Sequence, residues 1–409
     1  MKRIGVLTGG GDTSALNSIL YGIASAAQQQ DVEVLGFMRG WAGLLDSGQY
    51  AVLTPDMIDA DLGGTLLKTS RTKLAKIEGG YDQARANVSA LGIDGLVLIG
   101  GDDTISVAAQ FQDVPIAIIT KTIDNDVGAN CPEDQPLDFS KIVNYFTPGF
   151  PSAALRAAAF TSWHNGVRTT GYSHERIIVL ESMGMSAGWL ALASAYGHPD
   201  FIVVPEVPLD YAQFREKVAR KYLEQRHVLV VIAEGAVYTD QTVISQDTTN
   251  LDAFGHAKPG GCAEVIARRL KADLSGELKT RNFNAVIPSY LYRCGAPTPL
   301  DKKVGTKLGR KAVQILSRGQ SGKMASVRRT DNMLRIVTVD VRVLPRDNKG
   351  NIVPKRLDLR LYDRENLTIT SAGVEYFRAI LGEMPEPGQP AKLETRPTRG
   401  QRRSATYAG

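Results

Sequence analysis

The chain has 409 residues, 43% of them hydrophobic and 22% charged, which excludes global disorder and, at about 150 residues per domain, predicts two or three domains. The net charge is +5, but the residues from Lys392 onward carry five basic side chains and one acidic side chain, so the rest of the chain is about neutral and no nucleic-acid partner is expected. No apolar run is long enough to span a membrane, and the first residues do not form a signal peptide, so no membrane contact is expected. The three cysteines lack metal-ligand spacing and are expected to be buried or free thiols. We therefore expect a cytoplasmic protein.

Short apolar runs alternate with segments of helical spacing over the first part of the chain. The expected strands are Ile4–Thr8, Gly95–Ile99, Val114–Ile119, Arg176–Glu181, Phe201–Val204 and His227–Ala233, and the expected helices are Leu16–Ala27, Gln83–Leu91, Ser186–Tyr196 and Tyr211–Gln225. Apolar strands that alternate with helices are typical of a doubly wound parallel sheet, and the length of the chain predicts two such sheets. We therefore expect an α/β fold of two Rossmann-like lobes with mostly parallel sheets.

Two glycine-rich loops follow expected strands and precede helical segments. The first contains Gly10 and Gly11, and the second contains Gly101, Asp103 and Thr104. Glycines let a phosphate approach the backbone, and the N-terminus of the following helix offers amide donors and the positive end of the helix dipole. Neither loop matches a P-loop or a dinucleotide-binding fingerprint, so each is either a phosphate cradle or a tight turn between strand and helix.

Two adjacent carboxylates, Asp102 and Asp103, lie in the second loop. A carboxylate beside a bound phosphate is favourable where a Mg²⁺ ion lies between them, so the pair indicates a magnesium site. The alternative is that an aspartate caps the following helix, which explains one of the two carboxylates but not both.

A third polar segment, Lys121–Asp126 with the sequence KTIDND, follows the strand expected at Val114–Ile119. Phosphoryl transfer to an alcohol requires a base for the hydroxyl proton and cations for the phosphoryl oxygens, and this segment offers both. The alternative is a solvated polar turn. Because ligands bind beyond the carboxyl ends of parallel strands, the three segments together predict a phosphoryl-transfer site at one sheet edge.

These motifs resemble those of the phosphofructokinase family, of the A type, and the resemblance covers most of residues 1–330. The combination of a GGDD loop with a downstream TIDND segment is its most specific part. The matching segments are Gly10–Asp12 with Asn17, Gly64–Arg71, Gly100–Asp103, Thr122–Asp126, Ser173–Arg176, Met183–Gly184 with Gly188–Trp189, Ala233–Gly235 and Pro288–Arg293. The resemblance implies a phosphofructokinase fold and a Mg²⁺-dependent phosphotransferase.

The resemblance also indicates the phosphoryl donor. Members that use ATP usually carry glycine at the positions of Asp103 and Lys121, whereas members with Asp and Lys there resemble the pyrophosphate-dependent branch. An Asp side chain would collide with the α-phosphate region of ATP and repel it, and a Lys would compensate the charge of a compact pyrophosphate–Mg²⁺ complex. We therefore expect reversible transfer from pyrophosphate to the C1 hydroxyl of fructose 6-phosphate, which gives fructose 1,6-bisphosphate.

The resemblance implies a role for each residue of the site. Asp124 would be the general base, Lys121 and Arg71 would stabilise the phosphoryl group in transit, and Thr122 would complete the catalytic set. Asp102 would hold Mg²⁺. The donor is expected to contact Gly10, Gly11, Gly101, Asp103 and Thr104, and the sugar phosphate is expected to contact Asp126, Arg176, Met183, Gly184, Glu234, Tyr290 and Arg293. Because the resemblance implies that Arg176 reaches the site of a neighbouring subunit, we expect a homodimer or homotetramer with shared active sites.

Three departures from the family pattern leave the acceptor open. Met185 stands where the family has the arginine of its MGR motif, and Asn284 stands where it has a cation, although Lys279 and Arg281 are near enough in the sequence to substitute. The opening loop has Thr13–Leu16 where the family prefers a Pro-Gly pair. The alternative function is therefore a pyrophosphate- or ATP-dependent kinase of the same family for a different sugar, polyol or sugar phosphate. A non-catalytic sensor or regulatory subunit is disfavoured by the complete set of base, cation and metal-ligand candidates.

The expected domain boundaries divide the chain into two lobes and a tail. Residues 1–145 with about 255–300 are expected to form the larger lobe, which binds the donor, and about 146–254 with 301–385 the smaller lobe, which binds the sugar phosphate. The Pro- and Gly-interrupted segment Pro132–Pro151 is expected to cross between them. Residues 386–409 are expected to form a basic flexible tail.

Overall fold

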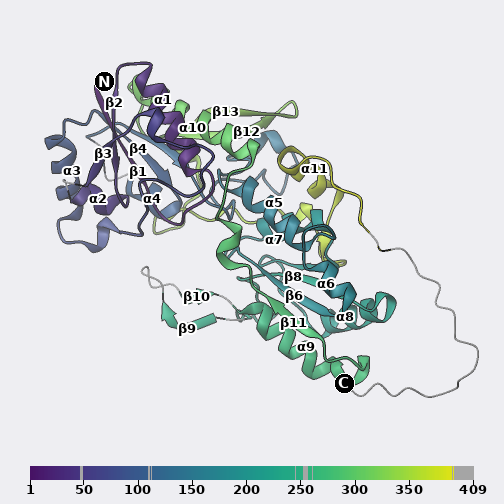
Figure 1. Ribbon diagram of the computed structural model, residues 1–409. Coiled ribbons are helices and arrows are strands. Elements are labelled where there is room, and N and C mark those ends of the chain that lie inside the picture. The colour runs from purple at the N-terminus through teal and green to yellow at the C-terminus, as the bar shows by residue number, and fades with distance from the viewer. Residues whose placement is uncertain are drawn as a thin grey trace, which may run out of the picture.

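The computed structural model describes residues 1–46, 49–108, 111, 113–244, 246–251, 257–259, 261–388 and 390, without the side chains of residues 103, 108, 246–251 and 257–259. Most of the tail expected at 386–409 lies outside the described residues. The predicted α/β fold is confirmed, since two mainly parallel sheets are covered by helices on both faces (Figure 1). Within the described ranges, no helix combines the length and apolar character needed to cross a membrane.

The larger sheet has seven strands in the order β13-β12-β5-β4-β1-β2-β3. Its bounds are β1 Arg3–Thr8, β2 Glu33–Phe37, β3 Tyr50–Val52, β4 Gly95–Gly100, β5 Ile116–Thr120, β12 Lys323–Thr330 and β13 Met333–Asp340. The edge strands β3 and β13 are antiparallel to their neighbours, and the central strands are parallel. Because β4 lies between β1 and β5, the three polar segments that follow these strands emerge next to one another at one edge of the sheet.

Alternate residues of the central strands enter two separate cores. In β4, Val97 and Ile99 face the core formed with α1 (Leu16–Gln28) and α10 (Pro299–Ser317). Leu96 and Leu98 face the opposite core, formed with α2, α3 and α4. These helices span Trp41–Leu45, Gly80–Ala90 and Asp102–Ala108. The division follows from the two-residue period of a strand, and it explains why the runs are apolar throughout.

The smaller sheet has the strand order β11-β6-β8-β7, and all its pairs are parallel. Its bounds are β6 Ile177–Ser182, β7 Phe201–Val203, β8 Val228–Ala233 and β11 Phe283–Val286. The helices around it are α5 Phe150–Thr161, α6 Arg168–Ser173, α7 Trp189–Ala193, α8 Tyr211–Gln225 and α9 Cys262–Leu278. A separate antiparallel pair, β9 Gln246–Leu251 and β10 Ala257–Pro259, precedes α9 (Figure 1).

The chain after β13 returns to the smaller sheet. It contains the short pair β14 Tyr362–Asp363 and β15 Thr368–Ile369, and then α11 (Ser371–Leu381), which packs on α5. On the way it passes behind the Lys121–Asp126 segment, where the backbone N–H of Lys355 donates to the Asp126 carbonyl at 2.6 Å. The C-terminal part of the chain is therefore attached to the carboxyl end of β5.

The strand pairing contradicts the expected lobe boundaries at two segments. β11, expected in the larger lobe within 255–300, pairs with β6 of the smaller sheet. β12 and β13, expected in the smaller lobe within 301–385, join β5 of the larger sheet. The crossing expected at Pro132–Pro151 also ends within α5, which begins at Phe150. The reason is that an apolar run predicts a buried strand but carries no information about which distant strand it pairs with.

Candidate active site

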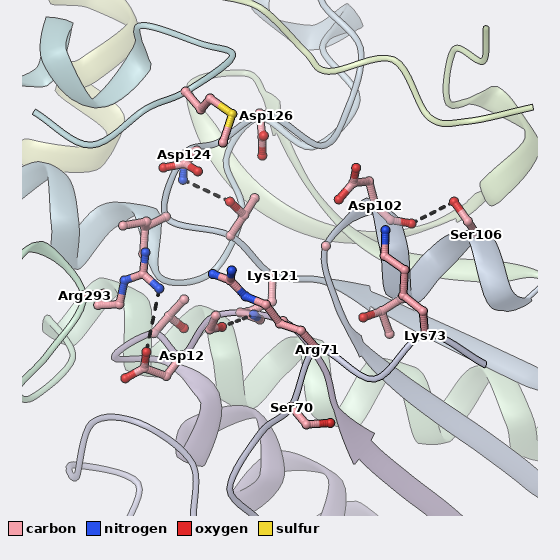
Figure 2. Close-up of a pocket in the computed structure, with 18 of the residues that line it drawn as sticks. Asp12, Ser70, Arg71, Lys73, Asp102, Ser106, Lys121, Asp124, Asp126 and Arg293 are labelled. Atoms are coloured by element: carbon pink, nitrogen blue, oxygen red, sulfur yellow. Dashed lines mark hydrogen bonds and ion pairs between the residues drawn. The ribbon is translucent and has the colours of Figure 1, made fainter. Parts of the chain in front are cut away.

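A cavity of about 900 Å³ lies at the carboxyl ends of strands from both sheets (Figure 2). Segments after β1, β4 and β5 form one part of its wall, and segments after β6, β8 and β11 form another. The predicted site residues that line it are Gly10, Gly11, Arg71, Gly101, Asp102, Thr104, Lys121, Thr122, Asp124, Asp126, Met183, Glu234, Tyr290 and Arg293. Residues that are up to about 280 positions apart in the sequence thus meet at one place.

The first glycine loop fits closely against two other segments. Gly10 has a φ of +78°, which favours glycine, and a Cβ at Gly11 would lie 2.6 Å from Nη1 of Arg293. A Cβ at Gly9 would lie 2.4 Å from Oγ1 of Thr104, whose buried side chain fills the space between the two glycine loops. Close packing at Gly9 and Gly11 and the positive φ at Gly10 therefore favour glycine in this loop.

The second glycine loop leads into α4 at Asp102. The nearest atom to a Cβ at Gly101 would be the Lys121 carbonyl oxygen at 4.0 Å, so the backbone there is open to the cavity. The exposed Asp102 lines the cavity, and its carbonyl accepts a hydrogen bond from Oγ of Ser106 at 2.9 Å (Figure 2). The side chain of Asp103 lies outside the described residues, so its expected clash with ATP stays a prediction.

Lys121 is buried beneath the first glycine loop. Its Nζ donates to the carbonyl of Gly9 at 3.0 Å and to the carbonyl of Gly11. Burial lowers the pKa of Lys121 to about 8, and the neighbouring positive charge of Arg293 acts in the same direction. An ammonium has three N–H donors, so one remains for an oxygen of a ligand in the cavity that Lys121 lines.

Three carboxyl groups meet in the cavity with raised pKa values. Burial raises the pKa of Asp124 to about 6, and the Glu234 carboxylate raises it further. Burial raises the pKa of Asp126 to about 7, with the negative charges of Asp124 and Asp102 as further causes, and burial raises the pKa of Glu234 to about 7. All three titrate near neutral pH and can exchange protons there.

The Thr122 hydroxyl holds the two aspartates of the segment in place. Its Oγ1 accepts a hydrogen bond from the backbone N–H of Asp124 at 3.0 Å, and the same side chain is hydrogen-bonded to Asp126. The Oδ1 atom of Asp124 is buried and has no hydrogen-bond partner among the described residues. An acceptor oxygen without a donor is unusual in a folded protein, and such an atom is suited to accept a proton or hydrogen bond from a ligand.

The remaining part of the wall comes from the segments after β6, β8 and β11. The Arg293 guanidinium lies 3.9 Å from Asp12 Oδ1, 3.6 Å from Met183 Sδ and 5.5 Å from the centroid of the exposed Tyr290 ring. The backbone N–H of Gly184 donates to Glu234 Oε1 at 3.1 Å. Gly184, predicted as a contact of the substrate, thus orients Glu234 and does not itself line the cavity.

The sequence profile described as phosphofructokinase matches residues 3–316 of the chain. The chain belongs to the phosphofructokinase family. A pyrophosphate–fructose 6-phosphate 1-phosphotransferase of Dictyoglomus thermophilum is 35% identical over 354 residues, which cover 85% of this chain and 94% of that protein. ATP-dependent 6-phosphofructokinase 3 of Streptomyces coelicolor is 36% identical over 338 residues, which cover 80% of this chain and 92% of that protein.

A solved phosphofructokinase structure has the same fold. The pyrophosphate-dependent phosphofructokinase from Nitrosospira multiformis superposes with a TM-score of 0.75 at 20% sequence identity, covering 96% of this chain and 95% of that chain. Family and fold therefore agree with the resemblance carried by the GGDD and TIDND motifs.

The departures from the phosphofructokinase pattern are visible in the structure. Met185 lines the cavity with 44% of its surface exposed, so an apolar side chain occupies the place of the family's arginine. Asn284 pairs in register with Ile178, near the beginning of β6, and does not line the cavity. This part of the cavity wall therefore has Arg293, and neither Met185 nor Asn284 adds a cation to it.

Arg176 does not line the cavity of its own chain. It precedes β6, whereas Met183 follows that strand, and at about 3.3 Å per residue the two lie about 20 Å apart. Its Nη1 donates to Thr170 Oγ1 at 3.1 Å. The expected role of Arg176 in a neighbouring subunit stays a prediction.

Sequence reasoning missed several residues of the site. Asp12 and Lys73 line the cavity, and both lie in or next to motifs already identified, so position alone could have indicated them. Figure 2 shows the Lys73 side chain directed toward Asp102. Lys355 lies behind the site at a distance of 230 positions from Asn125, and no local motif marks it.

Proposed function

We propose that the protein transfers a phosphoryl group reversibly from pyrophosphate to the C1 hydroxyl of fructose 6-phosphate. The observation that carries the proposal is the buried Oδ1 atom of Asp124, which has no partner among the described residues and belongs to the wall of a cavity that also holds Lys121 and Arg293. A carboxylate oxygen available to a hydroxyl proton, with cations nearby, is the arrangement that phosphoryl transfer to an alcohol requires.

In the proposed reaction, Asp124 takes the proton of the C1 hydroxyl as that oxygen attacks a phosphorus atom of pyrophosphate. The bond from this phosphorus to the bridging oxygen breaks, and inorganic phosphate leaves. Lys121 and Arg71, from different loops, stabilise the negative charge of the phosphoryl group in transit. In the reverse direction the protonated Asp124 returns the proton to the sugar oxygen, which is reasonable for a group with a pKa of about 6.

The residues present fit a Mg²⁺ ion bound together with pyrophosphate. Asp102 supplies a carboxylate at the mouth of the second glycine loop, and its negative charge contributes to the raised pKa of Asp126, so a cation between them would relieve repulsion. Mg²⁺ commonly takes one or two carboxylates together with substrate phosphates and water. Over the described ranges, no three metal-binding side chains are grouped closely enough to hold an ion together.

A second candidate donor is ATP. The cavity is also lined by Trp41, Leu74, Tyr81 and Val107, which belong to or pack on one apolar cluster and which pyrophosphate alone does not require. The relatives also include phosphofructokinases named as ATP-dependent. Lys121 favours pyrophosphate as the donor. The carbonyls of Gly9 and Gly11 hold its ammonium beside the first glycine loop, where it would compensate the charge of this compact ligand.

We also propose a cytoplasmic homo-oligomer in which Arg176 serves the cavity of a neighbouring subunit. The distance of about 20 Å between Arg176 and Met183 along β6 supports this, since Arg176 cannot reach the cavity of its own chain. Met185 and Asn284 stand where the family has cations. The loss of these two charges supports the alternative acceptors, which are a different sugar, polyol or sugar phosphate.

The test is an activity panel that combines two donors, pyrophosphate and ATP, with fructose 6-phosphate and a set of sugars, polyols and sugar phosphates. We expect Mg²⁺-dependent turnover of pyrophosphate with fructose 6-phosphate, and loss of it in a folded Asp124→Asn variant. Turnover with ATP but not pyrophosphate would refute the donor. Turnover of pyrophosphate with another acceptor only would refute the acceptor.

A further inference from the structure

Lys355 is a buried lysine behind the Lys121–Asp126 segment. Only 3% of its surface is exposed, and it does not line the cavity. Its Nζ donates to Oδ1 of Asn125 at 3.1 Å and to the carbonyl of Asn144 at 2.7 Å, while its backbone N–H donates to the Asp126 carbonyl. The side chain and the backbone of one residue thus both hold this segment.

Both acceptors of the Lys355 ammonium are neutral oxygens. The ammonium also lies 5.1 Å from the centroid of the Trp189 ring, whose Nε1 donates to the Lys355 carbonyl at 2.9 Å. Burial lowers the pKa of Lys355 to about 7, and the negative charge of Asp126 partly opposes this. A buried cation without a directly paired carboxylate is costly, and an apolar side chain of similar length would fill the same space at lower cost. Stability alone therefore does not explain a lysine at this place.

Asn125 connects Lys355 to the site. It is fully buried in the left-handed region with a φ of +56°, a conformation that most non-glycine residues avoid. Its Oδ1 accepts from Lys355 and from the Thr147 backbone N–H at 3.2 Å, and its Nδ2 donates to the Tyr376 hydroxyl at 2.9 Å. The amide is therefore fixed on both sides, and the backbone direction at Asn125 determines where its two neighbours point.

We propose that Lys355 is a positioning residue for phosphoryl transfer: by holding Asn125 from behind, it directs the carboxylates of Asp124 and Asp126 into the cavity. This inference rests on the proposed roles of the two aspartates. The Lys355 side chain does not line the cavity, so it acts on the two aspartates through its hydrogen bond to Asn125. A displacement of a reacting group by about 1 Å can cost about 10²-fold in rate, so a small shift of this segment is sufficient for a large effect.

The kinetic test compares four variants of the full chain with the wild type. Lys355→Met removes the ammonium at similar length, Asn125→Ala removes the acceptor, and the double variant removes both. Lys323→Met is the matched control, since Lys323 is a partly exposed lysine whose Nζ lies 2.7 Å from Asp340 in β13, outside the cavity. The readouts are kcat and KM for each substrate, with the folded fraction measured by circular dichroism.

We expect Lys355→Met to lower kcat by about 10²-fold with little change in the KM for the donor, and Lys323→Met to leave both unchanged. The double variant should be no slower than Asn125→Ala, because the two residues act through one contact. Wild-type kcat in folded Lys355→Met, or losses that multiply in the double variant, would overturn the proposal. If the Met variant does not fold, Lys355→Gln, which keeps an N–H donor, serves in the same comparison with Asn125→Ala.

A structural test separates this inference from the proposed function. Crystal structures of the wild type and Lys355→Met are compared at residues 122–126, without any substrate. We expect a displaced segment and a rotated Asn125 amide in the variant. An unchanged segment would overturn the positioning role whatever the enzyme acts on, whereas an inactive wild type with a displaced segment in the variant would refute only the proposed substrates.

Discussion

Replacement of the proposed base tests the electrostatics of the site, because Asp124→Asn is expected to slow the enzyme and to stabilise the fold. Burial and the Glu234 carboxylate raise the pKa of Asp124 from 3.8 to about 6. The folded chain therefore binds the Asp124 proton more tightly than the unfolded chain does. This contribution to stability is present at acid pH and is lost as the pH rises through about 6.

The size of the effect follows from the shift. A rise of about two pKa units at about 1.4 kcal/mol per unit makes the ionised Asp124 about 3 kcal/mol less favourable in the folded chain. Because Asp124 is partly exposed to water in the cavity, we take about half of this value, about 1–2 kcal/mol. An asparagine does not ionise, so the variant should be more stable than the wild type by this amount above about pH 7 and equal to it near pH 4.

The assay is thermal unfolding of both proteins over this pH range, together with kcat. We expect the difference in midpoint to grow with pH while kcat falls by about 10²–10⁴-fold, as for loss of a general base. Asp94→Asn is a control of opposite sign, since the Asp94 carboxylate accepts the backbone N–H groups of Lys2 and Arg3, which lower its pKa. A variant Asp124→Asn that melts at a lower temperature than the wild type at alkaline pH would refute the reasoning.

Three further predictions concern the cavity. The kcat/KM of the wild type should rise with pH through about 6, as the general base loses its proton, and fall above about 8, as Lys121 loses its own, which a pH–rate profile measures. Gly11→Ala would place a methyl group 2.6 Å from Nη1 of Arg293, so we expect the KM for the acceptor to rise about tenfold, whereas Gly276→Ala, with no atom within 4 Å of the new methyl, should leave the kinetics unchanged. Chelation of Mg²⁺ should abolish turnover, and Asp102→Asn should raise the Mg²⁺ concentration for half-maximal rate by about 10–100-fold; a variant with wild-type metal dependence would exclude Asp102 as a ligand.

The positions of many strands and helices could be predicted from the sequence, because apolar spacing, glycines and capping residues act within a few positions of the chain. The apolar run Gly95–Ile99 predicts a buried strand that ends in a glycine turn, and β4 extends one residue further, to Gly100. The helix expected at Tyr211–Gln225 is α8 to the residue, since its apolar positions keep helical spacing and Asp210 caps it by accepting from the Gln213 N–H. The helix expected at Ser186–Tyr196 is shorter, because only Trp189–Ala193 keeps α-helical geometry before a 3₁₀ turn.

By itself, the sequence determined the parallel α/β fold, the family and the residues that end β1, β4 and β5, because each follows from side chains close together in the chain. Only the tertiary structure decided which distant strands share a sheet, as β11 with β6 and β12 with β5. It also decided that Arg176 lies away from its own cavity, and that Lys355 lies behind Asn125. Strand partners, distances and burial arise only when remote segments pack, and the raised and lowered pKa values of the site are consequences of that packing.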